Sequence, residues 1–220
     1  GIAVIVEEIV INGEALGYGM GTGFFVGESG KDPEYIVTNF HVIQDFLAAG
    51  GGSGESTLAV FFNSSSYEEV YVVDYDQEMD LAILRLSRPT DQRLPMMLKE
   101  VSEDSVGSSV YAIGFPAVVD NSVNAVSFFD SEDATVTAGS ISRFLTESGT
   151  GRRIIQVDAV IHSGNSGGPL VDEDGNVIGI NTFTLTDSQG VKQEGLNYAV
   201  NVQELIPLLN RNNIAYEMAG

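Results

Sequence analysis

The chain is made of short apolar runs, rich in β-branched residues and separated by turn-forming residues. Such runs cover residues 2–6, 8–11, 35–38 and 81–86, and an Asn-Gly pair at 12–13 supplies a turn between strands. Gly occurs 25 times in 220 residues, and long helical patterns are scarce. The pattern predicts an all-β protein. A chain of this length can hold one double-barrel domain or two small domains.

Two segments break the run of strands. Residues 88–104 are polar and contain two prolines, so we expect them to connect two halves of the fold. Residues 201–211 have an apolar pattern that predicts a terminal helix, although Pro207 lies inside it. Because proline is tolerated in the first helical turn, either Pro207 occupies that turn or the helix starts late.

The charge is strongly negative, with 10 Lys and Arg against 31 Asp and Glu and a formal net charge of −21. This balance argues against nucleic acid and anionic membranes as partners, since both require basic patches. Three interpretations stay open: a self-repelling soluble surface, adaptation to a salty medium, or steering of cationic substrates. Cys is absent, and no stretch has the length of a membrane span. No signal peptide precedes Gly1, so we expect a mature or trimmed chain.

Residues 164–169, Gly-Asn-Ser-Gly-Gly-Pro, form the segment with the clearest chemical content. A serine hydroxyl becomes a useful nucleophile only where a base takes its proton and donors stabilise the oxyanion. The glycines permit a tight turn that points the N–H groups of Gly164 and Ser166, with Asn165 between them, into one small hole. A Gly-rich turn carrying a solvated serine is the alternative interpretation.

Two further segments favour the catalytic interpretation. His41 ends the apolar run that begins at residue 35, and Asp80 precedes the strand at 81–86. Asp74 and Asp76 are rival carboxylates, but the alternating strand after Asp80 would fix its position, and an orienting carboxylate needs buried support. A lone histidine in such a place is more often structural; its ordered partners reverse that expectation.

The acidic segment 172–176 resembles a calcium loop only superficially. An EF-hand needs Gly at its sixth position and Glu at its twelfth, and counting from Asp172 these positions hold Val177 and Phe183. A hairpin turn is the better interpretation. No cluster of His, Asp and Glu has the spacing of metal ligands, so we expect neither a metal nor another cofactor.

Several motifs together resemble the chymotrypsin-fold serine peptidases, and most of all the bacterial HtrA (Deg) branch. They are TNFHV at 38–42, DLAIL at 80–84 and GNSGGPL at 164–170, supported by GTGFFV at 21–26, AIGFP at 112–116, VTAGSIS at 136–142 and VIGINT at 177–182. The chain order His, Asp, Ser is that of the chymotrypsin-like group. The resemblance implies a single peptidase domain with two six-stranded antiparallel β-barrels of the chymotrypsin type, at 1–92 and 105–200, and a short helix at 201–211. We expect no PDZ domain in this chain.

The resemblance also implies roles for individual residues. His41, Asp80 and Ser166 correspond to the catalytic triad, and Gly164, Asn165 and Ser166 to the oxyanion hole. Thr182 would support the triad carboxylate, and Thr182, Phe183 and Thr184 would offer a strand edge to an extended substrate. The remaining positions expected to contact substrate are Val160, Ile161, His162 and Leu196.

The function implied is that of a serine endopeptidase acting on polypeptides, in protein quality control and outside the cytoplasm. By the same resemblance, the wall and floor of the pocket correspond to Val160, Ile161 and Leu196, which are apolar. With no carboxylate at the pocket base, we expect cleavage after small or medium aliphatic residues. Two alternatives are an idle peptide-binding domain that keeps the fold, and a secreted protease similar to glutamyl endopeptidases. The latter have a histidine where this chain has Asn181.

Residues 117–133 are longer than the usual loop of the family at this place and contain Phe128 and Phe129. We expect a self-packed surface loop. A flap that contacts the substrate or another subunit of an oligomer is the alternative interpretation.

Overall fold

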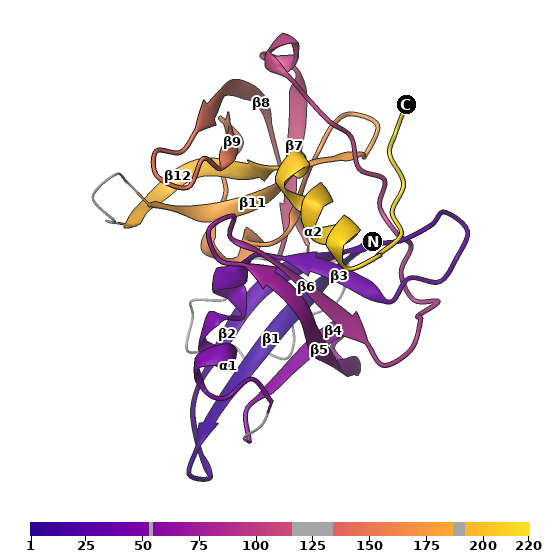
Figure 1. The fold of residues 1–220 in the computed structure, drawn as a ribbon, viewed down its shortest axis with the longest axis vertical. Helices are drawn as coiled ribbons and strands as arrows, with labels where there is room; N and C mark the ends of the chain where they lie inside the picture. The colour runs from indigo at the N-terminus through magenta and orange to yellow at the C-terminus, as the bar shows by residue number, and fades with distance from the viewer. Residues whose placement is uncertain (53–54, 116–133, 187–191) are drawn as a thin grey trace.

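The computed structural model describes residues 1–52, 55–115, 134–186 and 192–220. The predicted loop at 117–133 therefore lies outside the described residues. In the described part, twelve strands close into two antiparallel barrels, which lie one above the other in Figure 1. This confirms the predicted all-β class with two six-stranded barrels.

Neighbouring strands in each barrel are mostly consecutive in sequence. In order around the first barrel they are β1 (Ile2–Ile11), β2 (Glu14–Val26), β3 (Tyr35–Thr38), β6 (Leu81–Leu86), β5 (Ser66–Asp76) and β4 (Thr57–Asn63). In the second barrel they are β10 (Pro169–Val171), β11 (Val177–Thr186), β12 (Lys192–Asn201), β9 (Arg153–Val157), β8 (Thr135–Thr146) and β7 (Ser109–Gly114).

The first strand differs from the sequence prediction. The two apolar runs at 2–6 and 8–11 form one continuous strand, with a register shift between Ile9 and Val10. Asn12 and Gly13 both have positive φ, of 54° and 79°, as a two-residue hairpin turn requires.

Short helical segments connect and follow the strands. They are η1 (Phe40–Val42), α1 (Gln44–Ala48), η2 (Glu103–Ser105), η5 (Ser163–Asn165), η6 (Val202–Glu204) and α2 (Leu205–Arg211). The predicted terminal helix is confirmed, and its α-helical part starts at Leu205, so that Pro207 falls in the first turn. In Figure 1, α2 lies where the two barrels meet.

The apolar core has three main parts: the interior of each barrel and a cluster between the barrels. Strand β6 contributes to two of them, because residues alternate between faces along a strand. Ala82 and Leu84 belong to the interior of the first barrel, and Leu81 and Ile83 to the cluster between the barrels. All four are fully buried, and their packing fixes the backbone next to Asp80, which immediately precedes them.

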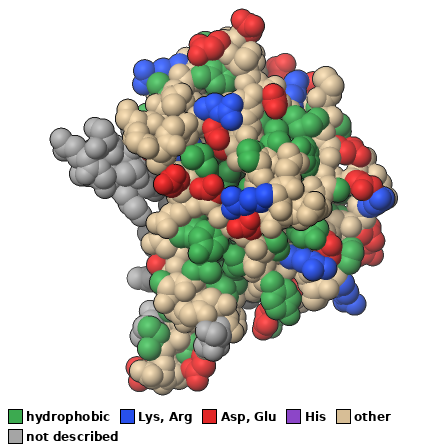
Figure 2. Space-filling view, in the orientation of Figure 1, with side chains coloured by type: hydrophobic (Ala, Val, Ile, Leu, Met, Phe, Trp, Pro, Cys, Tyr) green, Lys and Arg blue, Asp and Glu red, His purple; other side chains and the backbone are tan. Residues whose placement is uncertain are grey.

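The surface combines many carboxylates with few cations. On the face shown in Figure 2, Lys and Arg side chains lie among Asp and Glu side chains. Among the described residues, the cations that form ion pairs with carboxylates include Lys31, Arg85, Lys99, Arg152, Arg153 and Arg211. Among the described residues, none of the helices has the length and apolar character needed to span a bilayer.

The carboxylate of Glu7, in β1 of the first barrel, is buried. Glu7 is 5% exposed, and its Oε2 accepts a hydrogen bond of 3.0 Å from the backbone N–H of Phe46 in α1. Its carboxyl group also lies against Gly19 of β2, where an added Cβ would come within 2.3 Å of Oε1. Burial and the nearby Asp45 raise the pKa of Glu7 to about 7, although the hydrogen bond from the Phe46 N–H acts in the opposite direction and lowers it.

This burial predicts a pH-dependent stability. The folded-state pKa of Glu7 lies above the ordinary value of 4.5, so folding takes up a proton between these pH values and stability falls as the pH rises from 4.5 to about 7. Glu7→Gln removes the titration and keeps an oxygen acceptor for Phe46. As the pH is raised from 4.5 to 8, the free energy of unfolding of Glu7→Gln should increase by about 1–3 kcal/mol relative to that of the wild type, measured by urea denaturation. A difference that does not change with pH would contradict the prediction, and Glu8→Gln is the control on the opposite face of β1.

Candidate active site

Asp80 occupies a constrained position at the start of β6. Its φ is +56°, in the left-handed region that few residues other than Gly adopt. Two contacts hold it there: Asn39 Nδ2 donates to the Asp80 carbonyl at 2.9 Å, and Asp76 Oδ1 accepts from the N–H groups of Glu78 and Met79 in the preceding turn. The carboxylate is thereby directed back toward the segment that follows β3.

His41 lies in that segment, within η1. Its backbone N–H donates to Asp80 Oδ1 at 3.0 Å, and its Nδ1 lies 3.0 Å from Oδ1 and 2.9 Å from Oδ2. The imidazole is half-buried, and the buried neighbours Phe40 and Val42 fix its backbone. An Nδ1–H that donates to a carboxylate leaves Nε2 as the acceptor, which is the tautomer a general base needs.

The Asp80 carboxylate also receives contacts from the second barrel. Thr182 of β11 donates from Oγ1 to Oδ2 at 3.1 Å, and Arg152 Nη1 lies 3.8 Å from the same oxygen. Burial by itself would raise the pKa of Asp80, but the charge and hydrogen bonds of His41 and the charge of Arg152 hold it below its ordinary value. The carboxylate is therefore ionised at neutral pH although it is 8% exposed.

Arg152 is itself a buried charge, with an exposed fraction of 4%. It comes from the end of the β8–β9 hairpin and pairs with Glu147 of the same hairpin, Nε to Oε2 at 3.1 Å and Nη2 to Oε1 at 3.2 Å. Its Nη1 also reaches the carbonyl of Met79 at 3.5 Å. The hairpin of the second barrel is thus attached to the turn that presents Asp80.

Ser166 follows η5 and is 2% exposed. Within the described residues its Oγ is buried and has no hydrogen-bond partner, an uncommon state for a buried hydroxyl. Catalytic hydrogen bonds are often long in structures without substrate and shorten when the substrate binds. A Ser166 hydroxyl without a hydrogen-bond partner is therefore compatible with a side chain that forms its hydrogen bonds only when a substrate is bound.

The loop around Ser166 is attached to the first barrel through Thr22 of β2. The Thr22 N–H donates to the Ser166 carbonyl at 2.9 Å, and the Thr22 hydroxyl donates to the Gly164 carbonyl at 2.8 Å. The next residue, Gly167, has φ +83°, and a Cβ there would lie 2.1 Å from Thr38 Oγ1. Only glycine fits this approach, which explains the first glycine after the serine.

The residues expected to form the oxyanion hole lie together in this loop. Gly164 and Asn165 belong to η5, and the Asn165 N–H donates to the His162 carbonyl at 2.9 Å. Asn165 is fully buried beside Gly114, where an added Cβ would come within 2.7 Å of its Cα. The assignment of the Gly164 and Ser166 amides as oxyanion donors stays a prediction.

The residues expected to contact substrate are placed less uniformly. Val160 is 48% exposed and His162 is exposed, whereas Ile161 is buried in the core of the second barrel. The Ile161 N–H donates to Asn197 Oδ1 at 2.9 Å, which joins this segment to β12. The side chains of Phe183, Thr184 and Leu196 lie outside the described part of the chain, so the pocket walls stay a prediction.

The rival carboxylates have other partners. Asp74 binds Arg211 and Asn212 of the terminal helix region, and chiefly the Arg211 bonds lower its pKa to about 2. Asp76 forms the turn before Asp80 described above. Among the described residues, no group of three or more His, Asp or Glu side chains is arranged to hold a metal ion.

Comparison with known protein families shows to which family the chain belongs. Residues 21–180 match the model of the trypsin-like peptidase domain. The chain belongs to the trypsin-like peptidase family. Its relatives include Protease Do-like 1, chloroplastic, of Arabidopsis thaliana, 35% identical over 83% of this chain, and Serine protease Do-like HtrA of Lactococcus lactis, 32% identical over 87%. The chain spans only 37% and 44% of the length of these two relatives.

Solved structures place this trypsin-like peptidase domain in the same HtrA group. An HtrA-type protease with a tripeptide has a TM-score of 0.66 and 25% identity, over 95% of this chain and 58% of that one. Deg5 has a TM-score of 0.62 and 28% identity, over 94% of this chain and 88% of that one. The resemblance inferred from the motifs is confirmed.

The buried charged groups near His41 and Asp80 were not found from the sequence. Arg152 stands beside Arg153, and only the structure distinguishes them: Arg152 is buried against Glu147, while Arg153 is half exposed and pairs with Glu204. No sequence signal separates the two. For Glu7 a signal exists, because the two-residue period of a strand puts it on the same face as the core residue Ile5.

The buried pair predicts a large difference between these neighbouring arginines. Arg152→Met leaves the Glu147 carboxylate buried without its cation, so the free energy of unfolding should fall by about 3–5 kcal/mol. Adding Glu147→Met should recover most of that loss. Arg153→Met removes an exposed pair and should cost less than about 1 kcal/mol, all measured by urea denaturation. Equal losses for the two single variants would refute the buried network.

Proposed function

We propose that this chain is a serine endopeptidase domain in which Ser166, His41 and Asp80 act as one unit. The carrying observation is the Asp80 carboxylate, which contacts His41 Nδ1 from the first barrel and Thr182 from the second. His41 Nε2 takes the Ser166 proton as Oγ attacks the scissile carbonyl, and then gives it to the leaving amine. Water hydrolyses the acyl-enzyme by the same groups in reverse.

Asp80 has a supporting role in this cycle. As a carboxylate it fixes the His41 tautomer and stabilises the imidazolium that forms when the Ser166 proton is transferred. The developing oxyanion would be stabilised by the Gly164 and Ser166 amides, a contribution of about 3 kcal/mol per donor. No metal or other cofactor is required for these steps.

The substrate class follows from the family. A solved relative holds a tripeptide, which supports polypeptides as substrates here. We place the protein outside the cytoplasm and in protein quality control on the same family grounds. A catalytically idle peptide-binding domain is the competing function, and the buried, unpartnered Ser166 hydroxyl is the feature that a labelling experiment can test directly.

Labelling by a fluorophosphonate probe should modify Ser166 and be absent in Ser166→Ala. Turnover of a peptide substrate should fall by about 10³–10⁶-fold in Ser166→Ala or His41→Ala, and the double variant should lose little more, because the residues act as a unit. Ser65→Ala, in an exposed hairpin, is the control. Near-normal hydrolysis by a folded Ser166→Ala variant would exclude the serine mechanism. Absence of labelling and of turnover in the folded wild type would favour the idle binding domain.

The expected specificity is for small or medium aliphatic residues before the scissile bond. Val160, Ile161 and Leu196 bring apolar residues to the family's pocket positions, where an unpaired Lys or Arg head would cost several kcal/mol to bury. A Val or Leu side chain would instead gain roughly 1.5–3 kcal/mol. A peptide-library profile tests this, and dominant cleavage after Arg, Lys or Glu would overturn the pocket assignment while leaving the triad intact.

A further inference from the structure

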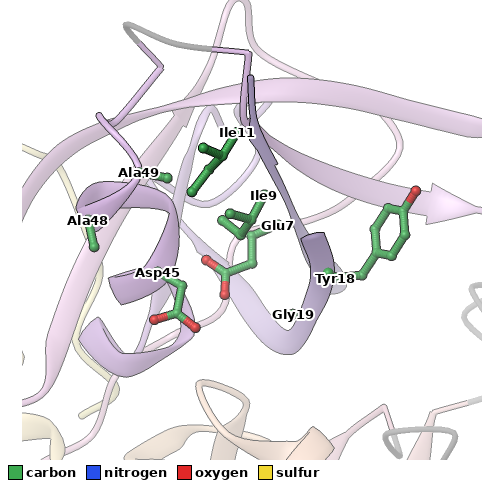
Figure 3. Close-up of a pocket in the computed structure, with 9 residues that line it drawn as sticks. Glu7, Ile9, Ile11, Tyr18, Gly19, Asp45, Ala48 and Ala49 are labelled. Carbon is green, nitrogen blue, oxygen red and sulfur yellow. The ribbon is translucent and has the colours of Figure 1, made fainter. Parts of the chain in front are cut away.

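A pocket opens between the β1–β2 hairpin and α1, outside the group of triad residues. Its volume is about 420 Å³, within the range of small-ligand sites. Both Glu7, from β1, and Asp45, from α1, line this space, and Figure 3 shows the Glu7 carboxylate directed toward α1, where Asp45 lies. The apolar part of the wall comes from Ile9, Ile11 and Ala48.

The chemistry of the pocket fits a long basic side chain. Its described lining contains two carboxylates and the Tyr18 ring but no Lys, Arg or His. Glu7 Oε2 is bonded to the Phe46 N–H, and its Oε1 lies close to Gly19, which also lines the pocket. Lys and Arg bury their methylene stems against apolar surface while the charged head meets a carboxylate. The charge of −21 on the chain favours the approach of such a group.

The pocket lies beside the reacting groups. Gly21, two residues after Gly19 along β2, is so near the nucleophile that an added Cβ would lie 3.3 Å from the Ser166 carbonyl oxygen. Two strand residues span about 7 Å, which is also the advance of two residues in an extended substrate. On the other wall, α1 begins three residues after His41. A polypeptide that passes Ser166 on the His41 side therefore reaches the pocket within two or three residues.

The side of the scissile bond follows from the mechanism. The acyl half of the substrate stays on Ser166, and the amine half receives its proton from His41, so the leaving half lies on the side of His41. The described lining of the pocket comes from β1, β2 and α1, all in the N-terminal half of the chain, and α1 directly follows the segment that carries His41. The expected strand edge at Thr182–Thr184 belongs to the second barrel, and serves the other half.

We propose that this pocket is a specificity subsite for a Lys or Arg side chain at the second or third position after the scissile bond, with Glu7 and Asp45 as its carboxylates. The proposal rests on the peptidase function proposed above. It adds a preference for a positively charged side chain in the leaving half of the substrate to the preference for an aliphatic side chain in the acyl half. Glu7 is the specificity-determining residue, since it is the buried member of the pair.

The ionisation of Glu7 is consistent with this role. Its pKa of about 7 means that the carboxyl is partly protonated near neutral pH without a ligand. The groups around it are Asp45 on α1, Tyr18 on β2 and His41 after β3. Of these, the charge of Asp45 raises the pKa of Glu7 and the charge of His41 lowers it. An ammonium or guanidinium in the pocket would lower the pKa of Glu7, so basic selectivity should strengthen as the pH rises through about 7.

Competition kinetics test the subsite. Two peptides that differ only in Lys or Met at the second position after the scissile bond, and a second pair that differs at the third, compete in one reaction. The ratio of their kcat/KM values cancels the titration of the triad. We expect Lys to be favoured about tenfold at pH 8 at one of these positions, corresponding to one charge-assisted hydrogen bond. The ratio should fall toward 1 at pH 5.5.

Matched variants identify the residue responsible. Glu7→Gln keeps the acceptor for Phe46 and should bring the ratio at pH 8 close to 1. Glu8→Gln makes the same charge change one residue along β1, where the carboxylate bonds the Tyr18 hydroxyl, and should leave the tenfold preference intact. A wild-type ratio of 1 at both positions, or a ratio that survives Glu7→Gln, would overturn the proposal.

Binding separates a failed subsite from a failed peptidase. The same Lys and Met peptides, carrying a fluorophore, are titrated by fluorescence anisotropy into Ser166→Ala, which needs no turnover. About tenfold tighter binding of the Lys peptide, lost in Ser166→Ala/Glu7→Gln, would support the subsite even if the wild type cleaves neither peptide. Equal binding of both peptides to Ser166→Ala would overturn it, whatever the wild type hydrolyses.

Discussion

The ionised Asp80 carboxylate, buried where the two barrels meet, is the constraint on which the site depends. A buried charge is costly unless hydrogen bonds and opposite charge surround it. Here His41 supplies donors from the first barrel, while Thr182 and Arg152 approach from the second. The carboxylate is therefore satisfied only when both barrels are folded and docked. The same contacts that make the charge tolerable also orient the imidazole.

The fold was largely predictable, because local patterns agree with the final structure. Short β-branched runs became strands, the Asn12–Gly13 pair became a turn, and Pro207 falls in the first turn of α2. The closure of the strands into two barrels came from the resemblance of the motifs. Glu7 differs from this pattern: a charged residue inside an apolar run predicts a break between strands, whereas the barrel buries Glu7 in an unbroken strand.

The site was predictable to the extent that its residues are marked by local sequence. His41, Asp80, Thr182 and the loop around Ser166 stand in recognisable motifs, and the structure brings the first three into contact. The role of Arg152 could not be found in this way, because Arg152 belongs to the second barrel and the Asp80 carboxylate beside it belongs to the first. Contacts of this kind depend on how two separately closed sheets pack, and no local pattern in either sheet records that arrangement.

The bonds from Thr22 to Ser166 and Gly164 have a consequence for the synthesis of the chain. The first barrel, which carries His41 and Asp80, leaves the ribosome first, while Ser166 follows in the second barrel. Until the second barrel closes and its loop meets Thr22, the Ser166 hydroxyl has no fixed position relative to His41. During translation, the contacts between the two barrels around Asp80 and Ser166 therefore cannot form until the second barrel has been synthesised and has folded against the first.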